Sequence, residues 1–250
     1  MSPPLRPPLI GVLGGMGPLA AVDFARKLLE VNTVDAEQQH VPTLLWNVPQ
    51  IPDRQLALAG GGASPLPAML QGIAVLNAAG ATRIAIPCNT AHHWFDELAA
   101  ASAAPLFHIV DAALAQLDAS AEKSRTKEVI GLLATRGALR SRLYQDRLDA
   151  LGLRHVGNTE NELEQLFMPG CYAVKHGHTE AGGHLLDAAG QRLLERGATR
   201  LILACTEVAT GLERVASPLL ACAVDTNEAL ARACVDYWRQ QSGVTNRDAA

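Results

Sequence analysis

The sequence predicts an α/β fold made of two similar halves, each with its own parallel sheet. Short apolar runs alternate with longer amphipathic stretches, and segments of the first half recur in the same order in the second. Alternation of strands and helices is typical of parallel sheets whose crossovers are helical. We therefore expect two parallel-sheet α/β domains, related by a pseudo-two-fold axis, with a functional cleft between them.

The individual elements follow from these runs. Strands are predicted at Leu9–Gly14, Thr43–Val48, Arg83–Pro87, Leu106–Val110, Val129–Ala134, Arg200–Ala204 and Leu219–Val224. Helices are predicted at Ala20–Val31, Leu66–Ala79, Ala91–Ala101, Ser141–Leu151 and Gly182–Arg196. The polar stretch Ala119–Glu128 is interpreted as a crossing between the halves. The two ends, 1–8 and 240–250, are predicted to be disordered tails.

An internal repeat supports the two-half organisation. Ile10–Leu19 resembles Ile130–Leu139, and Pro105–Asp111 resembles Pro218–Asp225. In the most specific pair, Gly-Ala-Thr-Arg is followed by four residues, apolar or Pro, and then a cysteine, Cys88 in one copy and Cys205 in the other. Short strand–turn motifs recur widely, but three pairs in the same order and at nearly constant separation favour a true repeat.

The repeat places the two cysteines at equivalent strand ends, the edge of an open α/β sheet where ligands bind. Two opposed thiols can remove a proton from one face of a carbon and return one to the other. A strand-to-helix position favours the thiolate, and Asn89, Thr90 and Thr206 are candidate caps of the helices that follow. Buried cysteines are more often core residues, and that interpretation is kept for Cys171, Cys222 and Cys234.

These motifs resemble the aspartate/glutamate racemase family, the branch that does not use pyridoxal phosphate. The matching segments extend from residue 10 to about 226: Gly14–Pro18, Ile51–Arg54, Pro87–His92, Ala134–Gly137, Val174–Lys175 and Ala204–Glu207. The resemblance implies racemisation of aspartate and/or glutamate by Cys88 and Cys205, without a cofactor or metal. It also implies a homodimer. Finally, it implies that the chain returns to its first domain, formed by 1–115 and 219–250, around a second domain of 116–218.

The resemblance also implies the substrate contacts. Asn89, Thr90 and Thr206 would hold the α-groups of the amino acid, while Gly15, Met16 and Thr135 would line the site. Arg54 and Lys175 would contact a carboxylate, and Glu207 would orient an ammonium group or tune the neighbouring thiol. The sequence departs from the family motif at Ala138, where aspartate racemases commonly have Thr. With Arg136 nearby, this change fits glutamate or broad specificity at least as well as aspartate.

Composition excludes several other classes. A net charge of −4 gives no basic surface for nucleic acid, and no apolar run is long enough to cross a bilayer. We expect a cytoplasmic protein, because the five cysteines are few, odd in number and not preceded by a signal segment. Its partner is expected to be a small-molecule substrate.

Several alternatives remain. Gly15–Ala20 fits a dinucleotide-binding glycine pattern, but the second predicted strand ends without the acidic residue that such sites need. A pyridoxal enzyme needs a lysine that forms a Schiff base with the cofactor, and Lys175 is the candidate in a motif position. His176 and His178, together with Glu180 and His184, suggest a metal, but the four do not make a convincing set of four ligands. A decarboxylase or isomerase that uses one cysteine, and a two-lobed amino-acid-binding protein without catalysis, also fit this fold class.

Overall fold

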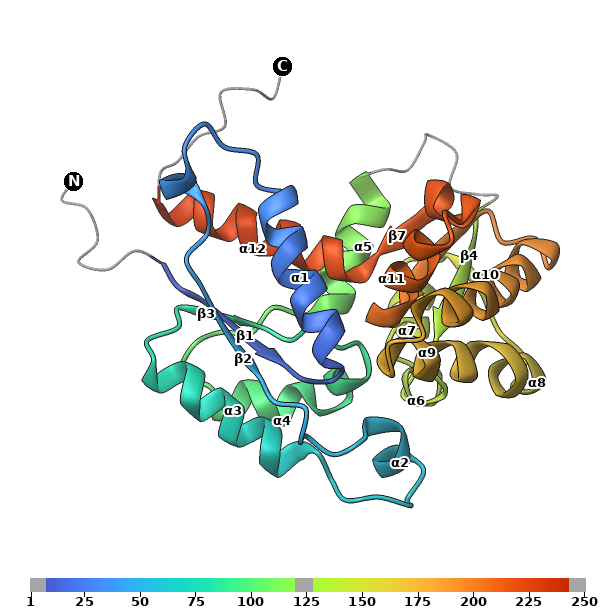
Figure 1. The fold of residues 1–250 in the computed structure, drawn as a ribbon, viewed down its shortest axis with the longest axis horizontal. Helices are drawn as coiled ribbons and strands as arrows, with labels where there is room; N and C mark the ends of the chain where they lie inside the picture. The colour runs from blue at the N-terminus through green and yellow to red at the C-terminus, as the bar shows by residue number, and fades with distance from the viewer. Residues whose placement is uncertain (1–7, 120–127, 243–250) are drawn as a thin grey trace.

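The computed structural model describes residues 8–119 and 128–242, which form two parallel sheets flanked by helices (Figure 1). The first sheet has the order β2-β1-β3 and the second the order β5-β4-β6-β7. The strands are β1 Ile10–Gly14, β2 Thr43–Asn47, β3 Arg83–Ala85, β4 Val129–Ala134, β5 Arg154–Gly157, β6 Arg200–Ala204 and β7 Ala223–Asp225. The α/β class with two parallel sheets is therefore confirmed.

Helices cover both sheets. They are α1 Pro18–Glu30, α2 Arg54–Leu58, α3 Leu66–Ala78, α4 Phe95–Ala101, α5 Ile109–Ala119, α6 Arg136–Arg140, α7 Gln145–Ala150, α8 Glu160–Glu162, α9 Met168–Lys175, α10 Thr179–Glu195, α11 Thr206–Arg214 and α12 Thr226–Ser242. Short 3₁₀ turns, η1 Glu37–Gln39, η2 Thr90–Trp94 and η5 Pro218–Cys222, and a π-turn, η4 Leu163–Phe167, join them. In Figure 1, α3 and α4 lie on one side of the first sheet and α1 and α12 on the other.

The same local topology recurs in both halves. The central strand β1 pairs with β2 and β3, and β4 pairs in the same way with β5 and β6. Every residue of β1 is buried, as expected for a strand covered on both faces. This recurrence agrees with the internal repeat, and the axis that would relate the halves stays a prediction.

Two predicted strands are wrong. At Leu106–Val110, the chain makes a single parallel bridge from Leu106 to Ile84 and then enters α5. At Leu219–Val224, the proline at 218 begins a 3₁₀ turn, which Ser217 caps by accepting the N–H of Leu219, and only β7 follows. The edge strand β5 was not predicted, because its sequence is mostly polar and partly exposed.

The predicted helices differ at their starts and ends. The stretch 91–101 divides into η2 and α4, and Ser141–Leu151 is interrupted because Arg142 has a φ of 50°, which leaves α7 only from residue 145. Of the predicted tails and crossing, residues 1–7, 120–127 and 243–250 lie outside the described residues. Pro8 is buried and 240–242 are helical, so those parts of the tail prediction are wrong.

Among the described residues, one of three clusters of buried apolar side chains spans the two halves, and each half also has a cluster of its own. A single cluster of buried side chains contains Ile10 and Phe24 from the first half together with Leu132 and Ile202 from the second. Within the last predicted segment, 219–250, β7 pairs with β6 in the second sheet, whereas α12 packs against α1 and α5. The domain bounds therefore stay a prediction, with β7 attached to the second sheet.

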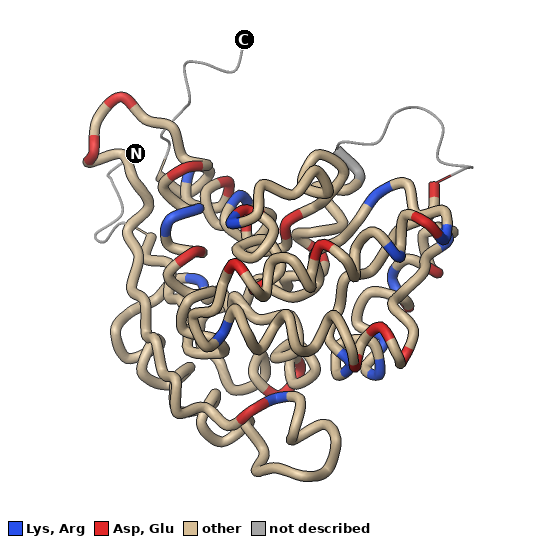
Figure 2. The backbone as a smooth tube through the Cα atoms, turned by 45° about the vertical axis from the view of Figure 1, so that its right-hand side comes forward, with Lys and Arg blue, Asp and Glu red and all other residues tan. Residues whose placement is uncertain are grey.

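Residues of both charge signs are distributed along the described backbone (Figure 2). Basic and acidic positions are interspersed along the two halves (Figure 2). No helix among the described residues is long and apolar enough to span a membrane.

Candidate active site

Cys88 and Cys205 line one small cavity. Cys88 follows β3, and Cys205 directly follows β6 as the residue before α11, so each sulfur reaches the cavity from a different sheet. Both side chains are only 5% exposed. The fold thus places two thiols from the two halves at one small cavity.

The cavity brings together nearly all the residues singled out from the sequence. Its lining consists of Met16, Asp53, Arg54, Gln55, Cys88, Asn89, Thr90, Thr135, Lys175, Cys205, Thr206 and Glu207. Gly15 is the candidate that does not line it. Gly15 has a φ of 101°, and a Cβ there would lie 2.1 Å from the Val48 carbonyl oxygen, so its role is to make the turn that presents Met16.

Cys205 lies among polar and ionisable neighbours. Its thiol is 3.0 Å from Glu207 Oε2, and the Cys171 thiol is 3.7 Å from its sulfur. The contact with Cys171, burial and the Glu207 carboxylate raise the pKa of Cys205 well above its ordinary value, although the Lys175 ammonium lowers it. Cys205 is therefore protonated in this arrangement.

Glu207 joins the Cys205 thiol to the glycine turn of the first half. Its Oε1 accepts the Gly17 N–H at 3.1 Å and lies 3.9 Å from Lys175 Nζ. Although burial and Arg54 lower the pKa of Lys175, the Glu207 carboxylate and the site thiols in their charged form raise it above its ordinary value. Lys175 is a cation at the cavity.

Arg54 is the second cation. It begins α2 and is buried, with Nη1 donating to the Ile51 and Pro52 carbonyl oxygens at 3.1 and 2.8 Å. Asp53 caps the same helix by accepting the N–H groups of Gln55 and Leu56. Burial raises the pKa of Asp53, but these backbone donors and the Lys175 and Arg54 cations hold it below its ordinary value. The motif at 51–54 therefore holds the Arg54 guanidinium in one position at the cavity.

Threonine hydroxyls and amides connect the halves across the cavity. Thr90 Oγ1 and Thr135 Oγ1 are 2.9 Å apart, and Gln55 Nε2 donates to Thr90 Oγ1 at 3.0 Å. The Asn89 amide donates to Thr226 Oγ1 and accepts from the Tyr144 hydroxyl. These contacts fix the polar groups of the two halves relative to one another.

The predicted helix caps are wrong. Asn89 precedes η2 without a side-chain cap, because its amide bonds to Thr226 and Tyr144. Thr206 is the first residue of α11, and Cys205 itself stands at the cap position. The start of α11 therefore places the thiol, rather than a threonine hydroxyl, at the positive end of the helix.

Some residues at the site were not found from the sequence. Asp53 stands in the Ile51–Arg54 motif, but no pattern singled out Gln55 or the position of Cys171 against Cys205. Arg136, expected as a further cation of the site, does not line this cavity and instead pairs with Glu160 at 2.7 Å. Contacts between residues far apart in the sequence, which no local motif encodes, decide these positions.

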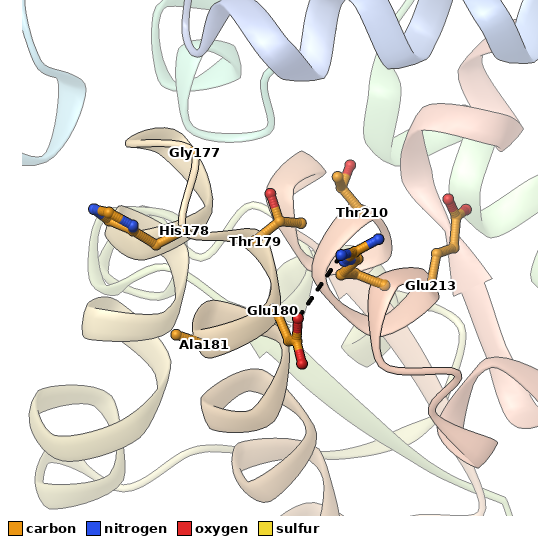
Figure 3. A pocket seen from close by; sticks show the side chains of 8 residues that line it. Gly177, His178, Thr179, Glu180, Ala181, Thr210 and Glu213 are labelled. Atoms are coloured by element: carbon orange, nitrogen blue, oxygen red, sulfur yellow. Dashed lines mark ion pairs between the residues drawn. The ribbon is translucent and has the colours of Figure 1, made fainter.

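A second hollow lies between the start of α10 and α11 (Figure 3). His178, Glu180, Thr210 and Arg214 line it, and Arg214 and Glu180 form an ion pair at 3.8 Å. Neither catalytic candidate contributes to this hollow. Within 8–119 and 128–242, no three His, Cys, Asp or Glu side chains come together as a metal-binding group.

The fold and the cavity define an α/β protein with paired thiols at a polar cavity. Comparisons with known proteins agree. The chain belongs to the Asp/Glu/hydantoin racemase family, whose model matches residues 13–234. The predicted resemblance is therefore confirmed.

Individual relatives match almost end to end. The broad specificity amino-acid racemase RacX of Bacillus subtilis is 25% identical over 239 residues, which is 92% of this chain and 98% of that protein. The structure of the Picrophilus torridus aspartate racemase is 27% identical with a TM-score of 0.79, over 94% of this chain and 97% of that one. Glutamate racemase RacE1 from Bacillus anthracis is 15% identical with a TM-score of 0.69, over 96% and 84%, and shares the fold. The chain is a racemase, and amino-acid racemisation is its activity class.

Proposed function

We propose that the chain racemises an acidic amino acid, aspartate and/or glutamate, by proton transfer between Cys88 and Cys205 without a cofactor. The observation that carries this proposal is one small cavity lined by two thiols from the two halves and by two cations. Two thiols suit a reaction in which one face of a carbon loses a proton and the other gains one.

The proposed reaction needs one thiolate and one thiol. The thiolate takes the α-proton, and the electron pair left on the carbon is delocalised into the α-carboxylate. The opposite thiol then gives its proton to the other face, so the thiol and the thiolate exchange roles. The high pKa of Cys205 makes it the protonated member at rest, ready to give its proton to the carbon.

Glu207 and the start of α11 have opposite effects on the protonation of the Cys205 thiol. The Glu207 carboxylate accepts a hydrogen bond from the thiol, which favours the protonated form. Lys175 and the start of the helix favour the thiolate that forms when Cys205 gives up its proton. Opposed influences of this kind keep a thiol usable as both acid and base.

The acidic substrate is proposed from the two cations, Arg54 and Lys175. Each charge-assisted contact to a carboxylate contributes about 1.5–3 kcal/mol. Two such contacts would disfavour a neutral amino acid by about a hundredfold or more, at about 1.4 kcal/mol per tenfold. The similarity to the aspartate racemase of Picrophilus torridus supports this substrate class, while the name of RacX leaves room for a wider range.

Single substitutions of the two cysteines test the proposal. Cys88→Ser and Cys205→Ser should each lower racemisation by about a hundredfold to ten-thousandfold, the range of one general acid or base. Cys222→Ser is the matched control, because Cys222 is only partly buried and does not line the cavity. Racemisation at the wild-type rate in either of the first two variants would exclude the two-thiol mechanism.

The substrate class is tested with Arg54→Ala and Lys175→Ala against a panel of enantiopure amino acids. Each variant should lose at least about tenfold in kcat/KM for aspartate and glutamate, with a much smaller loss for alanine. Circular dichroism shows whether each variant is folded. Equal turnover of alanine and of the acidic substrates by the wild type would contradict the role of the two cations.

We also propose that the enzyme is a homodimer. Three apolar side chains on α1, Leu19, Val22 and Leu29, are exposed in the monomer and would be covered by a second copy. Light scattering should therefore give about twice the chain mass of 26.5 kDa. A mass of one chain at micromolar concentration would contradict this.

A further inference from the structure

Gln55 connects the two halves of the molecule at the edge of the active-site cavity. Its Nε2 donates to Thr90 Oγ1 at 3.0 Å in the first half, and its Oε1 accepts the Gly137 N–H at 2.8 Å in the second. Both polar ends of the amide are thus used, which holds the side chain extended in one orientation.

The amide of Gln55 also separates two cavities. On one side is the active-site cavity, and on the other lies a larger cavity of about 180 Å³. Among the described residues, Gln55 alone lines both. A shorter side chain at this position would join the two spaces.

The second half provides the space that the Gln55 amide occupies. A Cβ on Gly137 would lie 2.9 Å from Gln55 Oε1 and 2.8 Å from a Leu58 methyl group, so the glycine leaves the room that the glutamine fills. Gly137 N then donates to the amide oxygen. The partition therefore depends on a matched pair of residues, one from each half.

The outer cavity has the chemistry of a longer acidic side chain. Leu56, Leu58 and Met168 offer apolar contacts for methylene groups, and Arg136 and Arg140 line it as cations. Arg136 is ion-paired with Glu160, whereas Arg140 is exposed at the end of α6. A carboxylate that passed beyond Gln55 would meet positive charge.

We infer that Gln55 is a specificity-determining residue that limits the length of the substrate side chain. This inference rests on the proposed function, in which the distal carboxylate lies near Arg54, the neighbour of Gln55 on α2. With the glutamine in place, the side chain ends inside the inner cavity. Without it, a side chain longer by one or two methylene groups extends into the outer cavity.

The test compares aspartate, glutamate and 2-aminoadipate, acidic substrates that differ by single methylene groups, in wild type, Gln55→Ala and Gln55→Met. The ratio of kcat/KM for 2-aminoadipate to that for aspartate should rise at least about tenfold in Gln55→Ala, since one methylene in a pocket changes rates by about 10–200-fold. Gln55→Met has similar length but no amide, so its ratio should stay within about threefold of wild type.

The outcomes separate this inference from the proposed function. An unchanged ratio in an active, folded Gln55→Ala would overturn the inference and leave the racemase proposal intact. A rise in Gln55→Met as large as in Gln55→Ala would also overturn it, because the hydrogen bonds rather than the side-chain length would then set the limit. Absence of acidic turnover in the wild type would overturn both proposals. Norleucine, long but neutral, should gain less than 2-aminoadipate in Gln55→Ala, and an equal gain would contradict the role given to the arginines.

Discussion

His92 links the backbone of Cys88 to the start of α5. Its Nε2 accepts the Ile109 N–H at 3.1 Å, so Nδ1 carries the proton and donates to the Cys88 carbonyl oxygen at 2.9 Å. Burial, together with His108 nearby, lowers the pKa of His92 to about 3. The ring is therefore neutral, and it acts as a positioning residue for the loop that carries the thiol.

A neutral buried histidine makes stability depend on pH. In the unfolded chain the ring takes up a proton below about pH 6.5, but in the folded chain it does so only near pH 3. Its contribution is therefore complete above about pH 6.5 and falls as the pH drops toward 3, by up to about 1.4 kcal/mol per pH unit. Urea unfolding at pH 7, 6 and 5 should show a shallower decline for His92→Gln than for wild type.

His93→Gln is the matched control, because His93 is exposed beside the same segment. The decline in His92→Gln should be shallower than in this control. Equal slopes for His92→Gln and wild type would show that the His92 ring is not held neutral.

For single residues, much of the site could be predicted from the sequence. Most candidates stand in motifs that directly follow strands, and strand ends meet at one edge of a sheet. Gln55 and Gly15 show the limit. Gln55 bonds to residues 35 and 82 positions away, which no local pattern encodes, and Gly15 serves the turn instead of the cavity.

Among the elements, α10 and α11 pack through glycines. A Cβ on Gly183 of α10 would lie 2.3 Å from the backbone oxygen of Gly211 in α11. Close approach of these helices fixes where α11 begins, and therefore where Cys205 lies. Strands were predictable because buried apolar runs are distinctive, whereas the polar edge strand β5 and the break at Arg142 depend on tertiary contacts and backbone conformation.

Gly183→Ala should destabilise the protein by about 1–3 kcal/mol, because the clash is with backbone that cannot move away. Gly190→Ala on the same helix meets mainly a Leu219 methyl group, which can rotate, and gains helix propensity of about 1 kcal/mol. Thermal unfolding of both variants should give a clearly lower Tm for Gly183→Ala. The reverse order would contradict the packing described.

For the whole molecule, a buried ionic cluster joins elements that are far apart in sequence. Lys27 of α1 is 3% exposed and pairs with Asp23 and with Asp225 of β7, while Asn227 of α12 donates to Asp23. Burial raises the pKa of Asp225 even beside Lys27. The cluster ties the helices of the first half to the edge strand of the second sheet.

Lys27→Met should destabilise the protein by about 3–5 kcal/mol, because it removes the cation that pairs with the buried Asp225 carboxylate, while Asp23 keeps its pair with Arg26. The neighbouring Arg26 is the control. Its side chain is 45% exposed although it also pairs with Asp23, and Arg26→Ala should cost at most about 1 kcal/mol, because Asp23 keeps its pair with Lys27. Guanidinium unfolding measures both. Similar losses in the two variants would mean that the buried cluster contributes no more than a surface pair.

The central claim is that two thiols act on opposite faces of one α-carbon. The most direct test follows enantiopure L-aspartate in deuterated water, by optical rotation and by NMR of the α-proton. Early in the reaction, each D-aspartate formed should carry α-deuterium, because the donating thiol has exchanged with solvent, while the remaining L-aspartate should stay almost unlabelled. Racemisation with the α-proton retained, or deuterium entering L-aspartate as fast as D-aspartate appears, would contradict the two-thiol account.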